Sequence, residues 1–184
     1  VSDLIDTIET KGVKVLITQY DGHKNFNGMS ARVNGSPVVV VGKHWTGDRQ
    51  RFTLAHELGH LVLHERLAQE LDEERACHRF AGAFLAPKPA VLQCLGERRT
   101  HLELQELHLL KLDWGLSMQA WSYRALDLNI DLVPDPNDPD TQWRPMLNEL
   151  SYVRQVRTNG SGGLTPGTVD SSEEFVNAWW WGFG

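Results

Sequence analysis

Two histidines and a glutamate form the motif H-E-x-x-H at His56, Glu57 and His60, inside a segment with helical periodicity. Residues four apart in an α-helix lie about 40° apart around the axis and about 6 Å apart along it, so both imidazoles can bind one ion. Glu57 falls on the same side, within reach of a water on that ion without being a ligand. The motif therefore predicts a zinc site, with the histidines as ligands and Glu57 as general base.

A catalytic zinc site with two histidines needs a third protein ligand and one open position. His64 is a poor ligand, because it lies about 12 Å along the axis from His56, whereas two nitrogens on one ion are at most about 4.2 Å apart. We expect it to cap or pack at the helix end. The next helix begins near Asp72 and supplies Glu73 and Glu74. Helical phase does not decide between them, and acidic residues are also common at helix starts without binding a metal.

The elements that must position these residues are a small sheet followed by helices. Strands are expected over three segments, of which the last two are joined by a turn at 34–36: residues 13–18, 26–33 and 37–41. The segment 37–41 is a candidate sheet edge for binding an extended peptide. Helices are expected over residues 3–11, 48–65, 72–86, 102–114 and 117–129. This order predicts an α+β fold, with a small N-terminal antiparallel or mixed sheet packed on the H-E-x-x-H helix and three or more further helices.

Composition narrows the class of protein. The chain is 41% hydrophobic and 23% charged, with a net charge of -6, which disfavours a nucleic-acid partner. No segment approaches the roughly 20 consecutive apolar residues that span a bilayer, so we expect no membrane association. Two cysteines, Cys77 and Cys94, do not make a disulfide framework, which favours a reducing compartment and a cytoplasmic location.

The character of the sequence changes after Val133. Five of the eight prolines and the Gly-Ser-Gly-Gly run at 160–163 follow this position, and the chain ends in an apolar segment with Trp179, Trp180 and Trp181. We therefore expect two units: a domain over residues 1–133, and an extension over 134–184 that is either flexible or docked on the domain.

Two motifs in order carry a resemblance to a known family. The H-E-x-x-H motif is followed at residues 74–87 by E-R-A-C-H-R-F-A-G-A-F-L-A-P. Together they resemble the ImmA/IrrE family of zinc metallopeptidases, whose second motif reads E-x-x-A-N-x-F-A-x-x-L-L-x-P. The resemblance spans residues 4–132 and implies a zincin-like fold, with Glu74 rather than Glu73 as the third zinc ligand.

Two residues depart from the family's second motif. Cys77 stands where alanine is usual, and His78 stands where asparagine or aspartate is usual. We expect Cys77 to pack in the core. His78 follows Glu74 by one helical turn, so it is expected to orient that ligand or to contact the reacting carbonyl.

The resemblance also implies a function. It indicates a zinc endopeptidase that cleaves a helix-turn-helix transcriptional repressor and so derepresses stress-response or mobile-element genes. Two alternatives remain at this point: a non-catalytic zinc protein acting as a toxin, antitoxin or sensor, and a helix-turn-helix DNA-binding module over residues 107–129. Charge disfavours the DNA-binding module, because residues 100–133 carry two basic and five acidic side chains.

Overall fold

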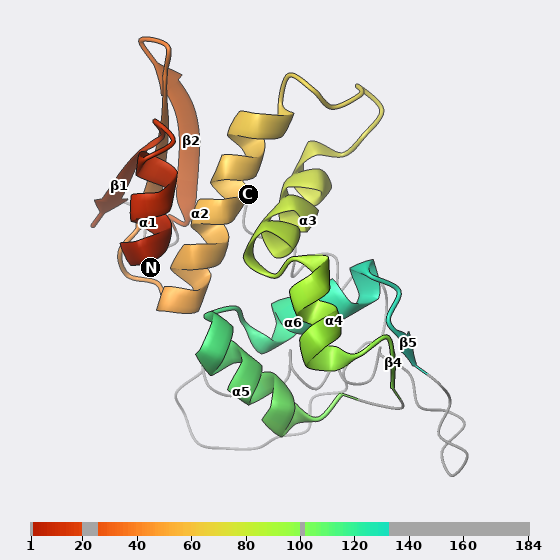
Figure 1. Cartoon of the computed structure of the whole chain (residues 1–184). Helices are drawn as coiled ribbons and strands as arrows, with labels where there is room; N and C mark the ends of the chain where they lie inside the picture. Colours follow the sequence, from red (N-terminus) through yellow and green to blue (C-terminus); the bar gives the residue numbers. More distant parts are fainter. Residues whose placement is uncertain (1, 20–25, 100–101, 133–184) are drawn as a thin grey trace, which may run out of the picture.

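The computed structural model describes residues 2–19, 26–99 and 102–132 (Figure 1). Its elements, in chain order, are α1 (Ser2–Glu9), β1 (Lys14–Thr18), β2 (Gly28–Val33), β3 (Ser36–Gly42), α2 (Gly47–Leu63), α3 (Glu73–Leu85), α4 (Lys88–Leu95), β4 (Arg98–Arg99), α5 (Leu104–Trp114), α6 (Met118–Asp127) and β5 (Asp131–Leu132). The predicted α+β class is confirmed. The predicted extension over 134–184 lies outside the described residues, so the boundary at 133 stays a prediction.

Helix α4 and the pairing of β4 with β5 are absent from the sequence prediction. Pro87 ends α3 and also stands at the N-cap of α4, which has a second proline in its first turn. Proline is well tolerated there, because the first N–H groups of a helix have no intrahelical partner. A helix of eight residues is too short for periodicity to reveal it.

The main sheet is mixed and has the strand order β1-β3-β2. Strand β1 pairs with β3 in parallel, and β2 pairs with β3 antiparallel through a tight turn. Asn34 and Gly35 in that turn have φ values of 50° and 80°, the left-handed conformation that a two-residue hairpin turn requires. The prediction that 37–41 is a sheet edge is wrong, because β3 is paired on both sides. In the described part of the chain, β1 and β2 are the edges.

Helix α2 lies between the sheet and helix α3 (Figure 1), and its residues take part in two cores. Toward the sheet, Leu54 packs with Ile8 of α1 and with Val39 of β3. Toward the other helices, Ala55 joins a larger cluster that includes the fully buried Trp121 of α6. Successive residues of one helix thus face opposite layers, as the 100° step between residues requires. Helix α2 therefore contributes side chains to both layers.

A close approach joins α2 to α3. A Cβ on Gly59 would lie 3.2 Å from Cδ1 of Phe80 and 3.3 Å from Cα of Cys77, so only a residue without a side chain fits here without displacing its neighbours. This contact brings the first turn of α3 beside the last two turns of α2. No helix in the described ranges is long and apolar enough to cross a membrane.

Candidate metal centre

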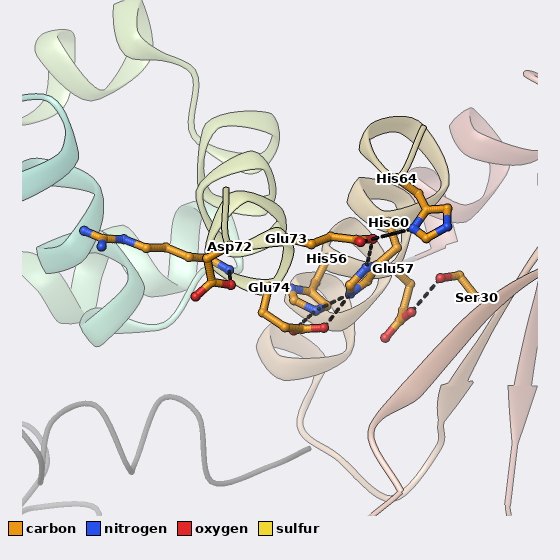
Figure 2. Close-up of polar contacts among 9 residues, drawn as sticks. Ser30, His56, Glu57, His60, His64, Asp72, Glu73 and Glu74 are labelled. Carbon is orange, nitrogen blue, oxygen red and sulfur yellow. Dashed lines mark hydrogen bonds and ion pairs between the residues drawn. The ribbon is translucent and has the colours of Figure 1, made fainter. Parts of the chain in front are cut away.

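The two histidines of the H-E-x-x-H motif and one glutamate of α3 converge on a single point (Figure 2). The Nε2 atoms of His56 and His60 lie 3.1 Å apart. The carboxylate of Glu74 approaches both, with Oε2 at 3.2 Å from Nε2 of His56 and Oε1 at 3.1 Å from Nε2 of His60. All three separations are below the limit of about 4.2 Å for two ligands of one zinc ion.

The chemistry of these groups fits a divalent cation such as zinc. Two imidazole nitrogens and a carboxylate are ligand types that zinc prefers. Burial, followed by the nearby His78 and His60, lowers the pKa of His56 to about 3, so this ring is neutral at neutral pH, as a metal ligand must be. A cation at the point of convergence would bind all three lone pairs at once. Three protein ligands would leave a coordination position for water or substrate.

Glu57 lies on the sheet side of α2 and is only 9% exposed. Its Oε2 accepts a hydrogen bond of 2.9 Å from Oγ of Ser30 in β2 (Figure 2). Burial raises the pKa of Glu57, although the bond from Ser30 lowers it in part. Strand β2 passes close to α2 at this point, because a Cβ on Gly28 would lie 3.3 Å from Cγ of Glu57. Ser30 was not expected from the sequence, and only the hairpin register brings it here.

Glu73, the other candidate ligand, lies on the opposite side of the His60 ring from Glu74. Its Oε1 is 3.0 Å from Nδ1 of His60, and both of its oxygens are 3.1 Å from Nδ1 of His64. These hydrogen bonds lower the pKa of Glu73. The two carboxylates are held in the first turn of α3, where Asp72 caps the helix by accepting a hydrogen bond from the Arg75 N–H. Adjacent glutamates therefore contact different atoms of one imidazole.

Residues 8–126 match the family model described as the IrrE N-terminal-like domain. The chain belongs to the ImmA/IrrE metallopeptidase family. No curated protein matches the chain. The matched range begins in α1 and ends in α6, so it includes His56, Glu57, His60 and Glu74. The resemblance drawn from the two sequence motifs is confirmed, and the chain carries an ImmA/IrrE-type peptidase domain.

Cys77 and His78, which depart from the ImmA/IrrE motif, occupy different surroundings. Cys77 is fully buried where α2 meets α3, and burial raises the pKa of its thiol to about 12. The prediction that Cys77 packs in the core is confirmed. The ring of His78 lies 4.4 Å from that of His56 and stacks at 5.9 Å on Phe52, measured between ring centroids. Burial lowers the pKa of His78 to about 4. His78 thus lies beside the proposed ligands, and its role stays a prediction.

Among the residues that the structure describes, two neighbouring groups place potential ligand atoms within 4.8 Å of one another. One contains His56, Glu74 and His78, and the other contains His60, Glu73 and Cys77. Both groups lie at the boundary between α2 and α3. His64 is the C-cap residue of α2, and its Nδ1 lies 3.1 Å from Oε2 of Glu73.

Proposed function

We propose that this ImmA/IrrE domain is a zinc-dependent endopeptidase. His56, His60 and Glu74 hold the metal, and Glu57 is the general base. The observation that carries the proposal is the convergence of two Nε2 atoms and one carboxylate within 3.2 Å, beside a buried glutamate. Family membership supports peptide hydrolysis as the reaction.

The reaction divides the work between the metal and this chain's own residues. Zinc, when bound, polarises the carbonyl of the scissile peptide and makes a water molecule acidic enough to lose its proton near neutral pH. Glu57 accepts that proton and returns it to the leaving amine. The Ser30 hydroxyl holds Oε2 of Glu57, which leaves Oε1 to exchange the proton. Burial brings the pKa of Glu57 closer to neutrality, where a general base is most effective.

The edge strand β2 offers a way to hold the substrate. In the described ranges β2 pairs with β3 on one side only, and it carries Ser30 next to Glu57. An extended peptide that adds to this edge would place its backbone close to the general base. The edge role assigned to 37–41 from the sequence thus moves to β2. Protection of the β2 amides from hydrogen exchange by an uncleaved substrate would support this, and unchanged exchange would contradict it.

The substrate that we propose is a helix-turn-helix transcriptional repressor, whose cleavage derepresses stress-response or mobile-element genes. Support for this class of partner is the membership of the ImmA/IrrE family. A repressor substrate is consistent with a cytoplasmic location, which we propose with it. The acidic net charge of -6 favours a protein partner over direct binding of nucleic acid.

The test uses the full chain, residues 1–184. Metal analysis of the purified protein should find about one zinc ion per chain. Incubation with a repressor encoded next to this gene, followed by mass spectrometry, should yield defined fragments. Glu57→Gln is the matched control, because it keeps the shape of the side chain but cannot accept the proton.

Three outcomes separate the hypotheses. Fragments from the wild type, and a rate about 10²- to 10⁴-fold lower for Glu57→Gln, support the peptidase. Bound zinc with a repressor that binds but stays intact would favour the non-catalytic zinc protein. A metal-free chain that stays inert when zinc is restored would refute the metallopeptidase assignment.

A further inference from the structure

The two histidines of the centre differ at their second ring nitrogen. Nδ1 of His60 lies 3.0 Å from Oε1 of Glu73, whereas Nδ1 of His56 is buried and has no hydrogen-bond partner among the described residues. A neutral imidazole carries its proton on one nitrogen, and only the other nitrogen offers a lone pair to a metal. The partner of Nδ1 therefore decides which nitrogen of His60 can be a ligand.

A carboxylate only accepts hydrogen bonds, so Nδ1 of His60 is the donor to Glu73. In the neutral ring that metal binding requires, the lone pair then lies on Nε2, the atom that faces His56 and Glu74. Glu73 is itself held, because both of its oxygens lie 3.1 Å from Nδ1 of the exposed His64. One carboxylate at the start of α3 thus connects two successive turns of α2.

Glu73 is also poorly placed to be a ligand. Its carboxylate contacts Nδ1 of His60 and Nδ1 of His64, whereas Glu74 occupies the Nε2 side of the His60 ring. Glu73 does not approach His56 as Glu74 does, at 3.2 Å. Carboxylates that accept from the outer nitrogen of a metal-bound histidine fix its tautomer and ring orientation.

We propose that Glu73 is a positioning residue, which keeps the proton of His60 on Nδ1 and so prepares Nε2 for the metal. The inference rests on the proposed function, in which Nε2 of His60 binds zinc. It assigns separate tasks to adjacent glutamates: Glu74 binds the metal, and Glu73 orients one of its other ligands.

The first measurement is zinc affinity, determined by competition with a chromophoric chelator on full-length protein. We expect Glu73→Ala to weaken zinc binding about 10- to 100-fold, the usual cost of losing such a partner. Glu70→Ala is the matched control, because it removes an equal charge from an exposed position just before α3. Its affinity should stay within about twofold of the wild type. Glu73→Gln should fall between them, since its amide oxygen can still accept from Nδ1.

The second measurement is the NMR signal of the His60 ring in zinc-loaded protein, which a merely structural role of Glu73 would not change. In the wild type the Nδ1 proton should be visible and exchange slowly with solvent. In Glu73→Ala it should exchange fast. Far-UV circular dichroism verifies folding, and if Glu73→Ala does not fold, the isosteric Glu73→Gln carries both measurements.

Different results would refute the role of Glu73 and the proposed function. Zinc affinity that is unchanged in Glu73→Ala but lost in Glu74→Ala would overturn the role of Glu73 and leave the metal centre standing. Unaltered exchange of the His60 ring proton in Glu73→Ala would do the same. A wild-type chain that binds no zinc would overturn both.

Discussion

The sheet side and the α3 side of helix α2 hold different parts of the proposed centre. On the sheet side, Ser30 of β2 donates a hydrogen bond to Glu57, the proposed general base. On the other side, Glu73 and Glu74 of α3 contact the histidines. In the proposed mechanism, binding of the metal and transfer of the proton thus depend on different neighbours of the same helix. Substitutions on one side should change one property and leave the other intact.

Glu74→Ala should have the largest effect, because it removes a proposed ligand on the α3 side. Zinc affinity should fall by more than the roughly 10- to 100-fold that an indirect partner contributes, and hydrolysis should reach background. Half of the Glu74 side chain is exposed, at 50%, so the fold should persist. Chelator competition measures the zinc affinity, and circular dichroism measures whether the fold persists. A variant that keeps wild-type zinc affinity would remove Glu74 from the ligand set.

Glu57→Gln should distinguish most clearly between the task of the sheet side and that of the α3 side. Hydrolysis should fall about 10²- to 10⁴-fold, because the base is lost, while zinc content stays at the wild-type level. Metal analysis and the fragment assay on the same preparation test this. Loss of zinc in this variant would show that Glu57 contributes to metal binding, and the division between the two sides would fail.

Gly59→Val tests the contact that holds α3 against α2. A Cβ at this position would lie 3.2 Å from Cδ1 of Phe80, so overpacking should cost about 1–3 kcal/mol of the free energy of unfolding. Urea denaturation of the metal-free protein measures this change in the free energy of unfolding.

Gly82→Ala is the control for that substitution, because among the described residues its Cβ would make an ordinary contact with Cδ of Arg124, at 3.5 Å. It should raise stability by roughly 0.5–1 kcal/mol through helix propensity. Equal stability of Gly59→Val and Gly82→Ala would contradict the close approach of the two helices.

Ser30→Ala should have the smallest effect, confined to the sheet side. Loss of one hydrogen bond to a charged group costs roughly 1.5–3 kcal/mol, so kcat should fall about 10- to 160-fold. Zinc affinity should not change. Ser30→Thr should restore most of the rate because it keeps the hydroxyl, and Ser36→Ala at the start of β3 is the control. A drop in zinc affinity would show that the two sides are coupled.

The sequence predicted most of the fold because its signals are local. The period of residues 48–65 and the Asn34-Gly35 turn correspond to α2 and to the β2–β3 hairpin as observed. His56 and His60 lie at the separation that one helical turn imposes, and the second motif predicted the family that the comparison confirms. The order of the strands in the sheet was not predicted correctly. The prediction that β3 is an edge strand was wrong, because β3 pairs with β2 on one side and with β1 on the other. The pairing with β1 is a contact that no local pattern encodes.

Local spacing along one helix placed the two imidazoles close together on α2 and Glu57 about 60° around the axis from His60, since helical geometry depends only on neighbouring residues. Which carboxylate contacts which nitrogen of His60 depends instead on the packing of α3 against α2. Glu73 and Glu74 are adjacent and chemically alike, and their contacts with opposite nitrogens of His60 follow from how α3 lies against α2 at Gly59. The partnership of Ser30 with Glu57 depends equally on packing, because it joins residues 27 positions apart that meet only when β2 lies against the helix.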